Sequence, residues 1–340
     1  MVKGGENMFL SQIVNNYGKM YSPYIRGKVN DLPMTQIALY KMSGDIEKVK
    51  NHTDLFLENV SFEPLKSDYP KVNSIDECLG RKELYGSCLD LMERKIDREG
   101  VDQVLHHVLN TYTLGLSSDL FHTIIRVAYA LEGYKTEEEL KDEVARSLAY
   151  YLTSYSEGKS FTREISGMDT VSEMTKIVEN PYIDGIRKSN MPFGQKLNNI
   201  YRDREFTQKG FVIGGTEEDK VRFLLNFVLP AFTNSNDNVI LHSITAIHAV
   251  VALKDYFDDF NNTLDILTSS IITHLMAMEK LDFTNRDRTL VDFSWRNIIC
   301  MGMESPDIHT IKLTYSCSEL GKRYEMVGLK KAVKKRIFQQ

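Results

Sequence analysis

Apolar residues recur along most of this chain at spacings of three and four, which is the pattern of one buried face of an α-helix. Strict alternation of apolar and polar residues over a strand length is hard to find. Successive patterns of this kind, joined by short connections, predict an all-α fold, built as a large helical bundle or as stacked helix pairs around a central cavity. Helix breakers are also scarce, with 8 prolines and 20 glycines in 340 residues.

Capping residues place several helix starts. Residues 30–34 join a capping residue to a proline in the first turn, which predicts a helix start. Thr136 and Thr216 each precede a run of acidic residues, and each is expected to open a long helix. Residues 223–232 form the most apolar run, and we expect a buried helix there that Pro230 brings to an end.

One stretch is the likeliest seam in the helical pattern. Near residues 180–215, prolines, glycines and polar residues interrupt the spacing, so a loose seam is expected there. Candidate site residues fall on both sides of this stretch. We therefore expect residues 1–340 to form a single helical domain.

Composition narrows the class of protein without identifying it. Apolar residues at 42% and charged residues at 26% are typical of a globular chain, and a net charge of -5 gives no reason to expect nucleic acid as a partner. The amino-terminal residues lack the apolar segment of a secretion signal, and no run approaches the roughly 20 apolar residues of a membrane span. The four cysteines contain no CxxC pair. These features predict a cytoplasmic protein with reduced thiols and no membrane span, and they do not indicate an oligomeric state.

Two segments superficially suggest phosphate binding. Residues 210–216 look like a turn between a strand and a helix, but they contain neither GxGxxG nor GxxxxGK[ST], and glycines before a Thr cap explain them. The basic run at residues 330–336 is expected to be a solvated helix end, with a phosphate or anionic-lipid contact as the less favoured alternative. Neither segment predicts a dinucleotide site.

Three apolar helical segments carry histidines beside other polar residues. At about 100° per residue, His122, Arg126 and Tyr129 fall on one stripe. His242 and Thr245 share a face, whereas His248 points about 120° away. In the third segment, His309, Lys312 and Ser316 share a face.

Buried groups of these types need partners. An imidazole has two ring nitrogens to satisfy, and a buried lysine is costly unless it is paired or neutral. Three helices that offer such groups could meet around a metal ion or a polar ligand. Taken singly, each histidine is more often a hydrogen-bonded core residue.

Four short segments match, in order, the elements of a known family. They are Asn-Asp-Leu-Pro-Met at 30–34, Phe-His-Thr-Ile-Ile-Arg at 121–126 with Tyr-Ala-Leu-Glu at 129–132, Leu-His-Ser-Ile-Thr at 241–245, and Asp-Ile-His-Thr-Ile-Lys at 307–312. These elements, together with a helix at 143–151, resemble those of the questin oxidase-like proteins, and they span most of the chain.

The resemblance implies an all-helical oxidoreductase that acts on aromatic polyketides, and fungal members open an anthraquinone ring. Their reaction is described either as an NADPH-dependent Baeyer–Villiger type oxygenation or as an iron-dependent dioxygenation. In the second description, histidines and a carboxylated lysine hold non-haem iron. Carried to this chain, the resemblance assigns His122, His242 and His309 as metal ligands and Lys312 as the lysine of the site.

Two positions depart from the family pattern. Asp31 stands where the family usually has His, and Asp can ligate iron through oxygen. Arg126 stands where fungal members have a second His, and a guanidinium cannot ligate a metal, although it can bind an anionic substrate or a reactive oxygen species.

Three hypotheses follow. In the first, the protein is a mononuclear non-haem iron oxygenase, Asp31 or carboxylated Lys312 supplies the anionic ligand, and Arg126 and Tyr129 orient the substrate or an oxyanion. In the second, a non-catalytic helical protein holds a lipid or another small apolar or aromatic ligand in the same cavity. In the third, an oxygenase uses NADPH without a metal, for which the chain offers no dinucleotide fingerprint.

Overall fold

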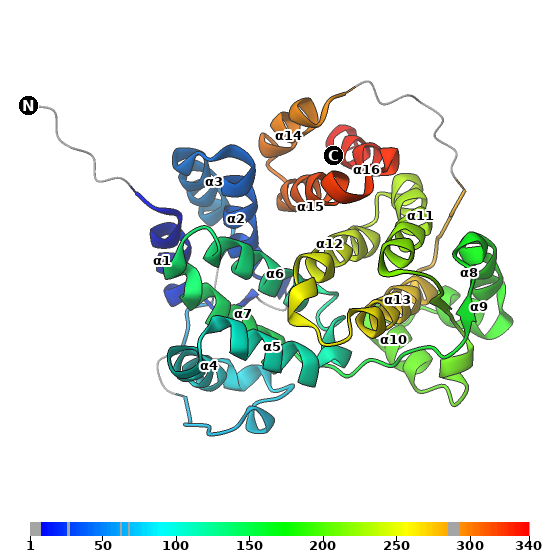
Figure 1. Ribbon diagram of the computed structural model, residues 1–340, viewed down its shortest axis with the longest axis horizontal. Coiled ribbons are helices and arrows are strands. Elements are labelled where there is room, and N and C mark those ends of the chain that lie inside the picture. The colour runs from blue at the N-terminus through cyan, green and yellow to red at the C-terminus, as the bar shows by residue number, and fades with distance from the viewer. Residues whose placement is uncertain (1–7, 26–27, 62, 67–68, 285–292, 340) are drawn as a thin grey trace, which may run out of the picture.

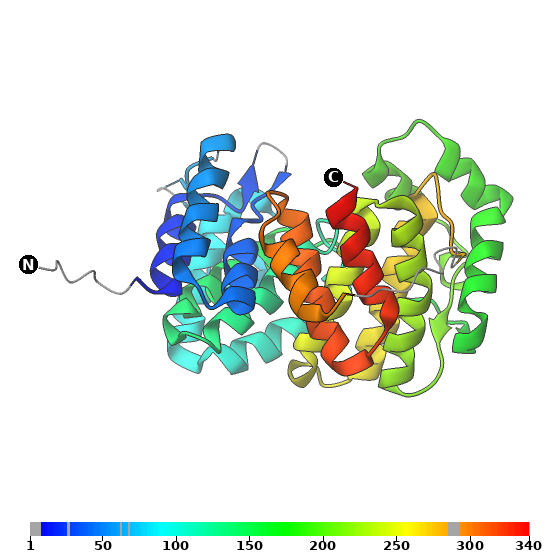
Figure 2. The same cartoon turned by 90° about the horizontal axis from the view of Figure 1, so that it is seen from above.

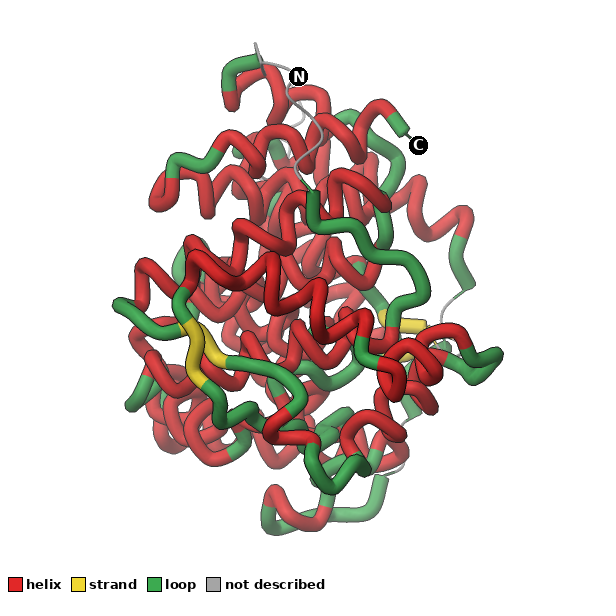
Figure 3. The backbone as a smooth tube through the Cα atoms, turned by 90° about the vertical axis from the view of Figure 1, so that its right-hand side faces the viewer, coloured by secondary structure: helices red, strands yellow, loops and turns green. Residues whose placement is uncertain are grey.

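The computed structural model describes residues 8–25, 28–61, 63–66, 69–284 and 293–339. Helices make up nearly all of the regular structure in these ranges (Figure 3), so the prediction of an all-α fold is confirmed. Four strands of two residues each form two small pairs. β1 (Tyr24–Ile25) pairs with β2 (Lys28–Val29) in antiparallel fashion, and β3 (Glu164–Ile165) pairs with β4 (Val212–Ile213) in parallel.

The first seven helices lie on one side of the molecule in Figure 1. They are α1 (Leu10–Met20), α2 (Leu32–Ser43), α3 (Ile46–Asn59), α4 (Tyr85–Glu99), α5 (Val101–Thr111), α6 (His122–Tyr134) and α7 (Lys141–Thr153).

The later helices lie mostly on the other side. They are α8 (Thr170–Glu179), α9 (Pro181–Lys188), α10 (Phe193–Tyr201), α11 (Glu217–Ser235), α12 (Asn238–Ala252), α13 (Phe260–Ala277), α14 (Trp295–Met303), α15 (Ile308–Tyr324) and α16 (Val327–Phe338). Seen from above (Figure 2), the carboxy-terminal helices in orange and red lie between the amino-terminal helices in blue and the later ones in green.

Four helices from distant parts of the chain meet between the two sides. α2 contacts α6, α6 contacts α12, α12 contacts α15, and α15 returns to α2. These contacts close a ring of helices. α12 is its most apolar member, and every residue from Ile240 to Val251 is buried.

Capping residues define several helix starts as expected. α2 follows Asp31 with a proline in its first turn, and the left-handed Gly44 ends it. α11 opens with a reciprocal capping box between Thr216 and Asp219, which confirms that the glycines at 210–215 precede a capped helix.

Two expectations about helix boundaries are wrong. α11 does not end at Pro230 but continues to Ser235. The proline removes the hydrogen bond to the carbonyl of Asn226, and because Asn226 is exposed, water can satisfy that carbonyl.

Thr136 also does not open α7, which begins at Lys141 after a short 3₁₀ turn (Glu138–Leu140). The Thr136 hydroxyl donates back to the carbonyl of Glu132 at 2.9 Å, and the Glu137 carboxylate accepts from the backbone N–H groups of Leu10 and Ser11 at the start of α1. The acidic segment therefore caps a neighbouring helix instead of its own.

No helix among the described residues combines the length and the apolarity needed to cross a membrane.

A buried ion group lies between α6 and α7. Glu143 accepts from Arg126 Nε at 2.8 Å and from Arg146 Nε at 2.7 Å, and all three side chains are buried. This group fixes the two helices against each other.

His274 of α13 is a buried histidine whose Nδ1 donates to the carbonyl of Ser270 at 2.7 Å. Burial lowers its pKa from 6.5 to about 4, and the hydrogen bond offsets only part of that change. Between about pH 4 and pH 6.5 the unfolded chain therefore binds a proton that the folded chain does not.

Because of this difference, His274 is expected to remove up to about 3 kcal/mol of unfolding free energy as the pH falls from 7 to 4. Urea unfolding across that range should show a flatter pH dependence for His274→Gln than for the wild type. The exposed His107, changed to Gln, is the control and should leave the wild-type slope. Equal slopes for wild type and His274→Gln would contradict the assignment.

Candidate metal centre

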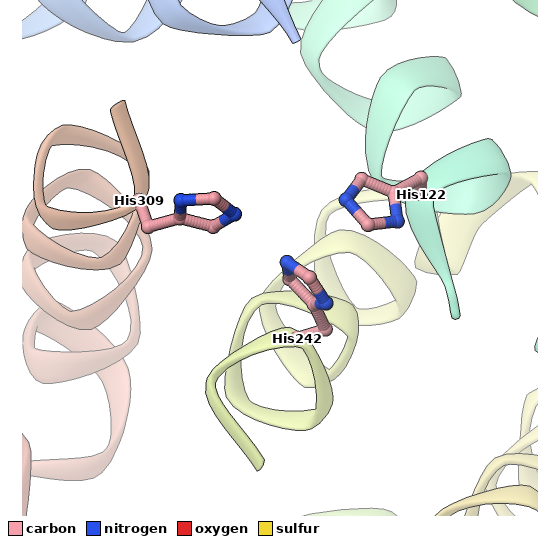
Figure 4. A group of neighbouring side chains, drawn as sticks. All are labelled: His122, His242 and His309. Carbon is pink, nitrogen blue, oxygen red and sulfur yellow. The ribbon is translucent and has the colours of Figure 1, made fainter. Parts of the chain in front are cut away.

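Three imidazoles from separate helices face one small space. His122 is the first residue of α6, His242 lies in the second turn of α12, and His309 is the second residue of α15. Figure 4 shows the three rings turned toward one another, and one ligand atom from each lies within 4.8 Å of the others. Helical spacing predicted these three histidines as candidate ligands, and the ring of helices brings them together.

His242 is the least satisfied member of the group. It is almost fully buried, and neither of its ring nitrogens has a hydrogen-bond partner among the residues that the structure describes. Its ring centroid lies 4.1 Å from that of His122 and 5.4 Å from that of His309. A buried polar atom without a partner costs roughly 1–3 kcal/mol.

His122 is held in place by an unusual turn. Asp119, Leu120 and Phe121 all have positive φ values, of 47°, 57° and 68°. Each such non-glycine residue costs roughly 1–2 kcal/mol. The turn brings the carbonyl oxygen of Asp119 within 2.6 Å of His122 Nδ1, so that Nδ1 carries the proton and Nε2 offers its lone pair to the group.

The Asp119 side chain is fixed in turn. Its carboxylate oxygens lie 2.8 and 2.9 Å from Lys82 Nζ, and Oδ2 also accepts from the Tyr150 hydroxyl at 3.2 Å. These contacts stabilise the strained turn that orients His122.

His309 is oriented by a neighbouring carboxylate. Its Nδ1 lies 3.3 Å from Asp307 Oδ1, which leaves Nε2 for the group. Asp307 also caps α15, because it accepts from the backbone N–H groups of His309 and Thr310. A histidine that donates to a carboxylate through one nitrogen and offers the other is the usual arrangement of a metal ligand.

Asp31 places a carboxylate beside the imidazoles. Its Oδ1 lies 3.7 Å from His122 Nε2, and its Oδ2 lies 4.0 Å from His309 Nε2. Lys312, one turn after His309, places Nζ 2.9 Å from Asp31 Oδ2, as an ion pair without the alignment of a hydrogen bond. Both side chains are buried, so Asp31 and Lys312 balance each other's charge.

The environment keeps two of the imidazoles, those of His122 and His242, neutral. Burial lowers the pKa of His122 and of His242, and the nearby Lys312 adds to both effects. Burial alone would raise the pKa of Asp31, but Lys312, His122 and His309 outweigh it and lower that pKa to about 2. At neutral pH the group therefore offers the neutral imidazoles of His122 and His242 and an ionised carboxylate, which are the forms that bind metals.

Arg126 and Tyr129 face other partners. Arg126 Nε binds Glu143, and its Nη1 has no partner in the described part of the chain. The Tyr129 hydroxyl contacts the Lys312 carbonyl at 3.2 Å and the Ser316 hydroxyl at 2.9 Å. Among described residues, neither side chain has a hydrogen bond to the three imidazoles, so their roles toward a substrate stay predictions.

His248 points away from the group, as its spacing from His242 indicated. Its Nδ1 lies 3.2 Å from Ser316 Oγ, and its Nε2 lies 3.6 Å from Glu132 Oε1. The sequence analysis did not assign roles to Asp119 or Asp307. The role of Asp307 could have been predicted, because it is a capping residue two positions before a candidate ligand. The role of the Asp119 carbonyl depends on a turn that no local sequence pattern predicts.

No model of a known protein family matches the chain, and no curated protein matches it significantly. The resemblance to the questin oxidase-like proteins therefore rests on the short segments quoted above.

The Asp31–Lys312 pair gives a direct test of the charge balance in the metal-free protein. Lys312→Met would leave a buried carboxylate without its cation, and it is expected to lower the unfolding free energy by roughly 3–5 kcal/mol. The double variant Asp31→Asn/Lys312→Met should lose less than the sum of the two single variants. Urea unfolding of the four proteins measures this difference.

The Lys220–Asp265 pair, 2.6 Å apart with a more exposed carboxylate, is the matched control. Lys220→Met is expected to cost less than Lys312→Met, because water can still reach Asp265. An equal loss in the two lysine variants would show that the Asp31–Lys312 pair is an ordinary ion pair.

Proposed function

We propose that this protein is a metal-dependent oxidoreductase that oxygenates a small aromatic or quinone-type molecule. Non-haem iron is the metal that we favour, with His122, His242, His309 and Asp31 as its ligands. NADPH would serve as a diffusing co-substrate, because the chain has no dinucleotide-binding motif.

The observation that supports a ligand most strongly is His242. A buried imidazole with two unsatisfied nitrogens is costly in a purely structural role, and a ligand at this point would remove that cost. The positions of His122 and His309 add to the argument, because a separate hydrogen bond directs Nε2 of each ring toward the same space.

The donor set fits iron. Three imidazoles and one carboxylate suit a first-row metal of the Fe²⁺, Mn²⁺ or Zn²⁺ class, and six-coordinate iron would keep two positions open. Two nitrogens that share an ion at about 2.1 Å lie at most about 4.2 Å apart. The ligand atoms of the three histidines lie within 4.8 Å of one another, so any pair near that limit would need to move closer on binding.

The anionic ligand that we favour is Asp31. It is a carboxylate already within 4.0 Å of two imidazoles, whereas Lys312 contacts Asp31 as an ion pair. Lys312 would then hold one oxygen of Asp31 while the other meets the metal.

A bound iron would supply the activation of dioxygen, and the chain's own residues would position the reactants. Asp119 and Asp307 keep the protons of His122 and His309 on Nδ1. Arg126 could meet an anionic substrate group only through Nη1, since Nε is bound to Glu143. Burial raises the pKa of Tyr129 well above 10, which keeps its phenol protonated as a hydrogen-bond donor.

A second candidate function is ligand binding without chemistry. It is favoured by a cavity of about 640 Å³ whose lining does not include the imidazoles. The lining joins apolar residues, such as Met191, Phe193 and Leu281, to polar and charged ones, such as Lys196 and Glu279. Native mass spectrometry that finds a co-purified apolar molecule and no metal would favour this function.

Metal binding is the first test. Elemental analysis of protein purified without added metal, followed by titration with Fe²⁺ under anaerobic conditions, should give about one ion per chain. His242→Ala should weaken binding at least 100-fold, because it removes one ligand of the set. His248→Gln, on another face of the same helix, is the control and should bind as the wild type does. No uptake of iron, zinc or manganese by the wild type would overturn the proposal.

Oxygenation is the second test. Iron-loaded protein with a phenolic anthraquinone and NADPH is expected to consume dioxygen, and His242→Ala should lose at least 100-fold of that rate. Oxygen uptake by electrode, with product mass as a second readout, measures the reaction. Rates in the metal-free wild type and in His242→Ala that equal the rate of the iron-loaded wild type would favour an oxygenase that needs no metal.

A further inference from the structure

The carboxy-terminal helix reaches back to the imidazole group through one side chain. Arg336 of α16 places Nε 3.0 Å and Nη2 2.9 Å from Asp307 Oδ2. Its Nη1 lies 3.4 Å from both the backbone oxygen and Oδ1 of Asn236. Only 13% of the side chain is exposed, so the interpretation of residues 330–336 as a solvated helix end is wrong for Arg336.

Each partner of Arg336 stands next to a helix that bears one of the candidate ligands. Asp307 caps α15, and its second oxygen faces Nδ1 of His309. Asn236 ends α11 in a left-handed conformation, and the next residue, Asp237, caps α12, which bears His242. One guanidinium therefore joins the starts of the two helices that carry His309 and His242.

We propose that Arg336 is a positioning residue of the metal centre, so that docking of α16 sets the separation of His242 from His309. This inference rests on the proposed metal site. Because coupling between two sites is reciprocal, metal binding would also stabilise the docked state of α16.

The chemistry of the contact supports this role. A guanidinium that meets a carboxylate through two nitrogens fixes direction as well as distance, which an ammonium does not. Asp307 transmits that direction to the His309 ring. Outer partners of metal-binding histidines typically change metal affinity 10- to 100-fold when they are replaced.

Arg336 could instead be a simple tether for the end of the chain, and the fold offers a matched comparison. Arg222 of α11 binds Glu218 through Nε at 3.0 Å and Nη2 at 2.8 Å, and its Nη1 donates to the carbonyl of Tyr324 at 2.9 Å. It thus joins a carboxylate and a backbone carbonyl, as Arg336 does, but at the far end of α15.

The experiment compares the full-length wild type with Arg336→Gln, Arg336→Lys and Arg222→Gln. Competition titrations with Zn²⁺ are expected to show at least 10-fold weaker binding for Arg336→Gln, a partial recovery for Arg336→Lys, and wild-type affinity for Arg222→Gln. With Co²⁺, the visible absorption bands should shift in Arg336→Gln alone, because they report ligand geometry.

Hydrogen exchange on the wild type supplies a measurement that needs no variant. Addition of Zn²⁺ should slow amide exchange in α16 (Val327–Phe338), and the effect should disappear in His242→Ala.

The outcomes separate the two proposals. A wild type that binds no metal overturns both the metal site and this inference. A wild type that binds metal, with unchanged affinity in Arg336→Gln or an equal loss in Arg222→Gln, overturns the inference alone. Unchanged exchange in α16 on metal binding also overturns it.

Discussion

The burial of His242 without a hydrogen bond is the constraint on which the candidate site depends. α12 is surrounded by other helices, so water does not reach the ring, and both nitrogens stay unsatisfied in the described structure. Each missing bond costs roughly 1–3 kcal/mol, a large share of the stability of an ordinary domain. An apolar side chain of similar size would avoid that cost. The imidazole is therefore better explained by a ligand that it binds than by the packing that it provides.

The other groups of the site also cost free energy of folding. Three consecutive non-glycine residues, from Asp119 to Phe121, adopt left-handed conformations before α6. Asp31 and Lys312 occupy the interior as an ion pair, which rarely stabilises a fold more than apolar residues would. Strain, unsatisfied nitrogens and buried charges thus gather at one point, where four helices meet. Such a concentration is typical of functional sites.

The sequence predicted the parts of this arrangement that depend on local spacing. Helical periodicity gave the fold class, and the stripes of His122, His242 and His309 gave the three rings that the structure brings together. The helix boundaries that depend on residues distant in the sequence were predicted wrongly. Glu137 caps α1 instead of α7, and α11 passes through Pro230 because the affected carbonyl belongs to an exposed residue. The contact of Arg336 with Asp307 joins residues 29 positions apart, and no periodicity reports it.

The electrostatics of the group separate the proposed functions. Asp31 and the three histidines all lie at a helix start or in the first two turns of α2, α6, α12 and α15. Each helix start contributes a positive field equivalent to about half an elementary charge. Asp31 and Lys312 cancel, so a divalent ion would leave the site with excess positive charge. A phenolate would relieve that excess, whereas a neutral lipid would not. The same field raises the cost of binding the metal itself, and the imidazoles must outweigh it. In an oxygenase, this positive field would stabilise an ionised aromatic substrate beside the metal. In a helical shell around an apolar ligand, the field would stabilise nothing.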